Sequence, residues 1–129
     1  MINTNAFDYI NVLDKAADAA WLRNDAISNN LANVDTPGYK RQDVNFEIQL
    51  QRAMKSNRFN TIDDKVENMN LKRMNPVTYR DHSGFSYRLD GNNVDIDTEN
   101  VELASNQIRM QGLYNSISQE FLNLQTVMK

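Results

Sequence analysis

The chain has 129 residues, a formal net charge of −3, no cysteine, one histidine and four glycines. This length fits one small domain, the missing cysteine excludes disulfides and thiolate metal sites, and the lone His82 excludes a histidine-rich metal cluster. Hydrophobic residues make up 40% of the chain, but 19 asparagines and a mean hydropathy of −0.67 leave little for a compact globular core.

The first residues carry no secretion or membrane signal. Residues 1–9 lack the basic and apolar regions of a signal peptide, so we expect no secretion with cleavage of a leader. The chain has no apolar run of about 18 residues, so we also expect no direct membrane span.

A heptad pattern predicts a long N-terminal helix within residues 1–36. Its apolar residues are spaced by three and four, and one position of the seam is polar. The predicted seam consists of Ile10, Leu13, Ala17, Ala20, Asn24 and Ile27. Small alanines allow close approach of another helix but bury little area each. The seam therefore predicts either a helical hairpin within the chain or packing between copies.

The end of this helix is predicted to be abrupt. Asn33 suits a left-handed helix cap, and the proline that follows Thr36 restricts that residue to an extended conformation. Pro37 and Gly38 suit the two central positions of a type II turn. We therefore expect the chain to reverse direction directly after the helix.

The middle of the chain, residues 37–90, is predicted to be largely irregular. The net charge is −3 over residues 1–39, +4 over residues 40–80 and −4 over residues 81–129. Acidic residues interrupt the basic ones, and no helical pattern for reading phosphates is present, so we expect no nucleic-acid binding. The basic stretch is either a solvated segment or an electrostatic contact between subunits.

Short elements are predicted inside this middle part. Residues 44–50 alternate as in a strand, but Phe46, Leu50 and Ala53 also fit one face of a helix, so both remain open. Residues 61–64 match a capping box, which favours a short helix over residues 62–72. Residues 85–89 resemble a short strand that runs into a turn at Asp90 and Gly91.

No catalytic or metal site is predicted. The acidic run at residues 90–99 fails the calcium-loop pattern, because its glycine is second instead of sixth and Val101 replaces the glutamate at position twelve. Asp81, His82 and Ser83 are adjacent in sequence, whereas a nucleophile and its base normally meet through the fold. We therefore expect no enzymatic activity and no cofactor.

A second heptad pattern predicts a C-terminal helix within residues 91–129. Asp97 or Thr98 is the expected N-cap, and Glu99 and Glu102 would place negative charge at the positive end of the helix dipole. The predicted seam consists of Leu103, Gln107, Met110, Tyr114, Ile117, Phe121, Leu124 and Met128. The expected fold is mainly α, with two long helices in a coiled-coil-like layer and at most a short β element.

The segment after the first helix resembles the signature of the bacterial flagellar rod and hook family. That signature reads S-x-N-hydrophobic-A-N-x-x-T-x-G-Y-K. It is matched, with Pro37 inside it, by Ser28, Asn30, Leu31, Ala32, Asn33, Thr36, Gly38, Tyr39 and Lys40. Residues 91–107 are similar to the matching region of the family's proximal rod subunits. The chain has no room for the β-domains that the longer distal rod and hook subunits insert.

The resemblance implies a structural role in the flagellar basal body. Such subunits assemble helically with copies of themselves and with the rod subunits FlgC and FlgF, link to the ring adaptor FliE and transmit torque. They reach the periplasmic side through the flagellar type III export apparatus without signal cleavage. The alternative is a cytoplasmic helical-hairpin adaptor or secretion chaperone, which would fold alone as a dimer.

Overall fold

The fold consists of two long helices and a short middle segment. The structure, a computed structural model, describes residues 5–55, 58–82 and 88–129. The long helices are α1 (Asp8–Ala32), preceded by the 3₁₀ turn η1 (Asn5–Phe7), and α4 (Ile96–Val127). The middle segment comprises β1 (Gln42–Val44), α2 (Glu47–Met54), α3 (Ile62–Glu67), η2 (Leu71–Arg73) and β2 (Thr78–Arg80). The prediction of a mainly α fold is confirmed.

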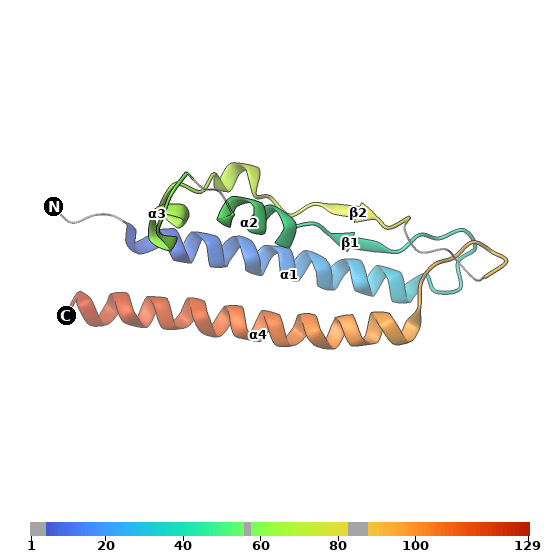
Figure 1. Cartoon of the computed structure of the whole chain (residues 1–129). Coiled ribbons are helices and arrows are strands. Elements are labelled where there is room, and N and C mark those ends of the chain that lie inside the picture. Colours follow the sequence, from blue (N-terminus) through green and yellow to red (C-terminus); the bar gives the residue numbers. More distant parts are fainter. Residues whose placement is uncertain (1–4, 56–57, 83–87) are drawn as a thin grey trace.

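These elements form three layers, with α1 in the centre (Figure 1). The helix α4 lies antiparallel to α1 on one side, and the middle segment covers the other side. At about 1.5 Å per residue, the 25 residues of α1 and the 32 residues of α4 make rods of roughly 37 and 48 Å. Among the described residues, no helix is long and apolar enough to cross a membrane.

The face of α1 that packs on α4 carries small and aliphatic residues. Ile10, Ala17, Ala20 and Ile27 are buried at helical spacing. The amide of Asn106 in α4 donates to the backbone carbonyl of Ala20 at 2.8 Å, which places this face against α4. A small side chain at position 20 is what lets a side chain of α4 reach the backbone of α1.

The opposite face of α1 packs on the middle segment. The apolar core consists of Ala19, Ala26, Val44, Phe46 and Met74. The strands β1 and β2 pair antiparallel, with Gln42 opposite Arg80 and Val44 opposite Thr78. The sequence pattern did not predict strand β2, because all three of its residues are exposed and leave no alternation of apolar and polar positions.

The two interpretations left open for residues 44–53 each apply to a part of that segment. The strand β1 ends at Val44, and α2 begins at Glu47. Phe46 is buried in the core and Leu50 and Ala53 pack beside it, as the helical spacing predicts, while Ile48 is exposed. The spacing of the buried residues changes here from that of a strand to that of a helix, because the buried face continues from β1 into α2.

One boundary in the middle segment differs from the predicted one. The capping box does start a helix, since the Thr61 hydroxyl accepts from the backbone N–H of Asp64 at 3.1 Å, but α3 ends at Glu67 and a separate 3₁₀ turn follows. The predicted strand at residues 85–89 falls mostly outside the described residues. A turn follows it as expected, because the N–H of Gly91 donates to the carbonyl of Arg88 at 3.1 Å.

Replacing Phe46 by alanine should lower the free energy of unfolding by about 3–5 kcal/mol, because a ring that is 3% exposed leaves a cavity in the core. Ile48→Ala is the matched control: its side chain is 52% exposed, and we expect a change within about 0.5 kcal/mol. Urea unfolding followed by circular dichroism measures both. Equal losses in the two variants would contradict the placement of this core.

Candidate functional site

The most extensive polar contacts lie where α1 ends and α4 begins. We define the polar junction as Asn30, Arg41, Asn92 and Glu99. Three of these side chains are almost completely buried, with relative exposures of 0% for Asn30, 1% for Asn92 and 0% for Glu99. Buried polar groups are stable only when their hydrogen bonds are made, so the contacts of the junction hold three segments in fixed positions.

Asn30 connects α1 to the first residue of β1 and to α4. Its amide nitrogen donates to the carbonyl of Gln42 at 2.8 Å and to the Glu99 carboxylate at 3.1 Å. Its amide oxygen accepts from the backbone N–H of Gln42 at 2.7 Å and from the hydroxyl of Tyr39 at 3.3 Å. The side chain of Asn30, a residue of the predicted signature, therefore binds both backbone groups of Gln42, as a neighbouring strand would. It also binds Glu99 in the first turn of α4.

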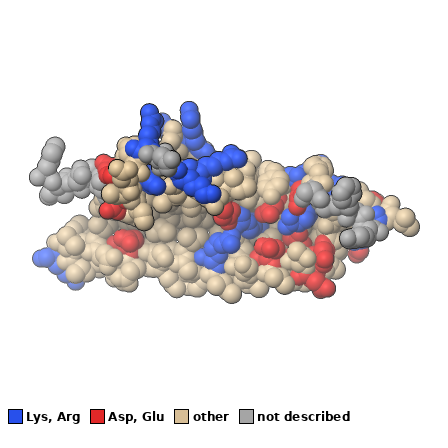
Figure 2. Space-filling view, viewed as in Figure 1, with Lys and Arg blue, Asp and Glu red and all other residues tan. Residues whose placement is uncertain are grey.

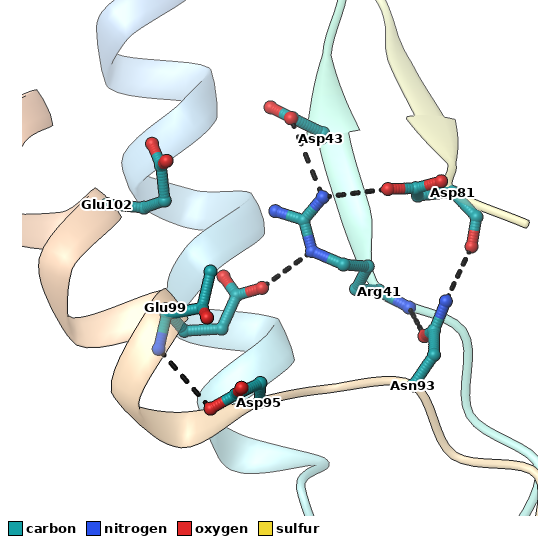
Figure 3. A pocket seen from close by; sticks show the side chains of 8 residues that line it. Arg41, Asp43, Asp81, Asn93, Asp95, Glu99 and Glu102 are labelled. Atoms are coloured by element: carbon teal, nitrogen blue, oxygen red, sulfur yellow. Dashed lines mark hydrogen bonds and ion pairs between the residues drawn. The ribbon is translucent and has the colours of Figure 1, made fainter. Parts of the chain in front are cut away.

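The buried Glu99 and the half-buried Arg41 form an ion pair in the junction (Figure 3). Arg41 donates from Nε to the carboxylate of Glu99 at 2.7 Å and from a terminal nitrogen to that of Asp81 at 3.0 Å. Burial alone would lower the pKa of Arg41, but the hydrogen bond and charge of Glu99, with further acceptors beside it, raise that pKa well above its ordinary value. The guanidinium is therefore permanently charged, and Glu99 compensates that charge inside the protein.

Asn92 binds the end of α1. Its amide nitrogen lies 2.9 Å from the carbonyl oxygens of Asn33, Val34 and Thr36, and its amide oxygen accepts from the N–H of Val94 at 2.8 Å. These carbonyls belong to the C-cap of α1 and to the turn that follows it. A residue about sixty positions further along the chain therefore binds this turn, so the end of α1 is joined to the segment that leads into α4.

The turn after α1 has the predicted type II geometry. Gly38 has φ +71°, and the N–H of Tyr39 donates to the carbonyl of Thr36 at 3.3 Å. The N–H of Gly38 also donates to the carbonyl of Asp90 at 2.7 Å, which connects this turn to the one that precedes α4. The predicted left-handed cap at Asn33 is wrong, since its φ is −109°. The left-handed residue of this turn is Gly38 instead, because glycine has no Cβ and adopts a positive φ without strain.

The other signature residues surround this turn. Lys40 donates from its ammonium group to the carbonyl of Gly91 at 2.5 Å, and Asn33 donates from its amide to the carbonyl of Asn29 at 2.8 Å. Leu31 is half-buried. The remaining ones are exposed: Ser28, Ala32, Thr36 and Pro37. The signature thus combines residues that hold the junction together with residues that face outward.

A cavity of about 340 Å³ adjoins the junction (Figure 3). It is lined by Arg41, Asp43, Asp81, Asn93, Asp95, Thr98, Glu99 and Glu102. Arg41 points into the group of carboxylates and is bound to several of them. In the part of the chain that the structure describes, no group of three or more His, Asp and Glu side chains is arranged to hold a metal ion.

The start of α4 corrects the predicted N-cap. The cap is Asp95, two residues before the earlier of the two predicted positions, and its carboxylate accepts from the N–H groups of Asp97 and Thr98 at 3.0 and 3.3 Å. Asp97 and Glu99 lie in the first turn. Glu99 therefore adds negative charge to the first turn as predicted, and its side chain binds Arg41.

The structure divides the predicted C-terminal seam into two columns. Leu103, Met110, Ile117 and Leu124 are half-buried on the face that packs on α1. The other column, Gln107, Tyr114, Phe121 and Met128, is exposed. The positions that complete the packed face are instead Glu99, Asn106, Leu113 and Glu120, one residue earlier in each heptad. On α1, Leu13 and Asn24 are half-buried beside the four buried seam residues.

A second ion-pair group, which the sequence did not suggest, connects α1, α2 and α4. Arg23 is 8% exposed and its guanidinium binds both carboxylate oxygens of Glu47 at 2.5 and 2.6 Å. Arg109 of α4 reaches the same carboxylate at 2.8 Å. Burial would raise the pKa of Glu47, but the hydrogen bonds and charge of Arg23, with the charge of Arg109, lower it below its ordinary value. The sequence did contain one indication of this group: Arg23 is a charged residue on the same helix face as the apolar Ala19 and Ala26.

Comparison with known proteins identifies the same signature region. Residues 10–40 match the family described as flagella basal body rod protein. The chain is 36% identical over 117 residues to the flagellar basal body rod protein FlgB of Bacillus subtilis (strain 168), covering 90% of this chain and 89% of that protein. It is 32% identical over 135 residues to FlgB of Borrelia hermsii, covering 93% and 95%. It is 27% identical over 118 residues to FlgB of Escherichia coli (strain K12), covering 83% of each.

Replacing Glu99 by glutamine should lower the free energy of unfolding by about 1.5–3 kcal/mol, because Arg41 loses its closest charged partner and keeps only Asp81 and Asp43. Glu102→Gln is the matched control, since Glu102 lines the same cavity but is exposed, and we expect a change within about 0.5 kcal/mol. Urea unfolding compares the two. If both variants were as stable as the parent, Glu99 would not hold the junction.

Gly38→Ala should lower the free energy of unfolding by about 1–2 kcal/mol, and Gly38→Val by more, because φ is +71° there. No heavy atom lies within 4 Å of the added Cβ, so the loss reports backbone conformation and not a clash. Gly112→Ala in α4 also meets nothing within 4 Å and should stabilise the protein by about 0.4–1 kcal/mol. Thermal unfolding separates them, and a stabilising Gly38→Ala would be inconsistent with this turn.

Proposed function

Because the chain belongs to the FlgB family of flagellar basal body rod proteins, we propose that it is a structural subunit of the proximal rod, assembling helically through its terminal helices and transmitting torque. Proteins of this family are structural components of the rod, and this chain assembles with other rod components in the flagellar basal body. Its residues therefore act through packing and not through chemistry on a substrate.

The observation that carries this proposal is the unpartnered surface of α4. Only Glu99 and Asn106 are buried among its 32 residues. Large apolar side chains outside the packed face remain in water, with relative exposures of 67% for Val101, 76% for Ile108, 52% for Phe121 and 53% for Leu122. Val101, Ile108 and Leu122 are separated by multiples of seven residues and so lie along one side of the helix, which favours a contact with another protein. Neighbouring subunits of a rod would cover it.

The partners that fit this role are further copies of the chain, the rod subunits FlgC and FlgF, and the ring adaptor FliE. The chain would reach the periplasmic side of the basal body through the flagellar type III export apparatus, without cleavage of a signal peptide. Its elongated shape supports this position, because a subunit in which α1 and α4 lie antiparallel can pack side by side with its neighbours (Figure 1). The polar junction would keep α1 and α4 in register under load.

The test is deletion of the gene in its own host and complementation by variants, scored by motility and by electron microscopy of basal bodies. We expect the deletion strain to be immotile and to lack the rod, and the intact gene to restore both. A motile deletion strain would refute the proposal. A strain that assembles normal rods but fails to export another flagellar protein would favour the secretion chaperone instead.

In the same strain, Phe121→Glu should abolish rod assembly while the purified protein keeps its helix content, because Phe121 lies outside the face that packs on α1. Asn123→Asp is the matched control. It adds the same charge on the polar face that Glu102, Arg109 and Ser116 form at seven-residue spacing, and it keeps the oxygen that accepts from Gln119. Normal rods with Phe121→Glu would show that this part of α4 is not an assembly surface.

A further inference from the structure

The helix α1 has a third face, which packs on neither α4 nor the middle segment. We define the acidic stripe as Asp14, Asp18, Trp21 and Asp25, which follow one another at spacings of four, three and four and are all exposed. The indole of Trp21 is 61% exposed. Among the residues that the structure describes, none of the three carboxylates has a hydrogen bond or an ion pair.

A patch of opposite charge lies on the middle segment. Figure 2 shows Lys and Arg side chains gathered over α2 and α3. We define the basic patch as Arg52, Lys55, Lys72 and Arg73, which come from the end of α2 and from η2 and are exposed. Within residues 5–55, 58–82 and 88–129, none of these four side chains is paired with a carboxylate.

We propose that the acidic stripe of one subunit is the docking face for the basic patch of a second copy of this chain. The proposal rests on the proposed function, since it names one contact by which copies assemble. Stripe and patch are complementary in charge, and no ion pair joins them within the chain. Trp21 stands between Asp18 and Asp25, where an arginine or lysine side chain can cover its ring while binding the flanking carboxylates.

The symmetry of this contact suits a rod. The two surfaces are different parts of one chain, so each subunit offers both, and each contact leaves a free stripe at one end and a free patch at the other. Such a heterologous contact continues as a helical assembly unless its rotation closes a ring, whereas a self-complementary contact stops at a dimer. Exposed ion pairs are individually weak and screened by salt, so several must act together around the tryptophan.

Charge reversal in the complemented deletion strain tests the contact. We expect Asp14→Lys with Asp18→Lys to abolish rod assembly, Lys72→Glu with Arg73→Glu to do the same, and all four changes together to restore it. Glu67→Lys is the control for charge reversal as such, because it reverses one charge at an exposed site outside the stripe and the patch, and it should assemble normally. Circular dichroism of each purified variant verifies that it folds like the parent.

Cross-linking tests the same contact directly, because the chain has no cysteine of its own. Asp18→Cys combined with Lys72→Cys should give disulfide-linked multimers in isolated basal bodies, while Glu102→Cys with Lys72→Cys should stay monomeric. Wild-type assembly of the Asp14→Lys, Asp18→Lys variant, no rescue by the fourfold change, or no multimers would each overturn the proposal. If charge reversal blocks assembly but the cysteine variants cross-link only to a different rod protein, that protein docks on the stripe and the proposed contact between copies is wrong. In all these cases an immotile deletion strain leaves the proposed function standing.

Discussion

The buried carboxylate of Glu99 is the constraint on which the arrangement of the chain depends. It lies in the first turn of α4 and is bound by Arg41, which precedes β1, and by Asn30, which belongs to α1. Three segments therefore meet at one group, and removing any partner loses a hydrogen bond to a buried charge. Together with the hydrogen bond from Asn106 to the carbonyl of Ala20, this polar anchor fixes how the two long helices are aligned.

The central helix α1 explains how so short a chain builds an elongated molecule. One face packs on α4, the second packs on the middle segment, and the third carries the acidic stripe in water. Two of its three faces are therefore used inside the subunit. The outer helix α4 uses only one face, so its remaining apolar side chains are available to neighbours. Under the proposed function, neighbouring subunits that cover these side chains would add burial to a core that is small in the single chain.

The signature segment contributes to folding inside the subunit as well as to the outer surface. Asn30 is completely buried, and Gly38 allows the turn whose backbone binds the loop before α4. Ser28, Ala32 and Pro37 face outward on the same segment. One short stretch of sequence thus holds the junction together and also forms part of the exposed surface at the end of α1.

The sequence by itself determined the mainly α fold, the type II turn at Pro37 and Gly38, and the family, because heptad spacing and turn chemistry are local properties. Only the tertiary structure decided that Asn106 and not Gln107 packs on α1. A heptad offers two flanking columns, and the hydrogen bond of Asn106 to the backbone of α1 selects between them. The pairing of Asn30 with Glu99 was equally hidden, since residues 69 positions apart meet only when both helices have packed.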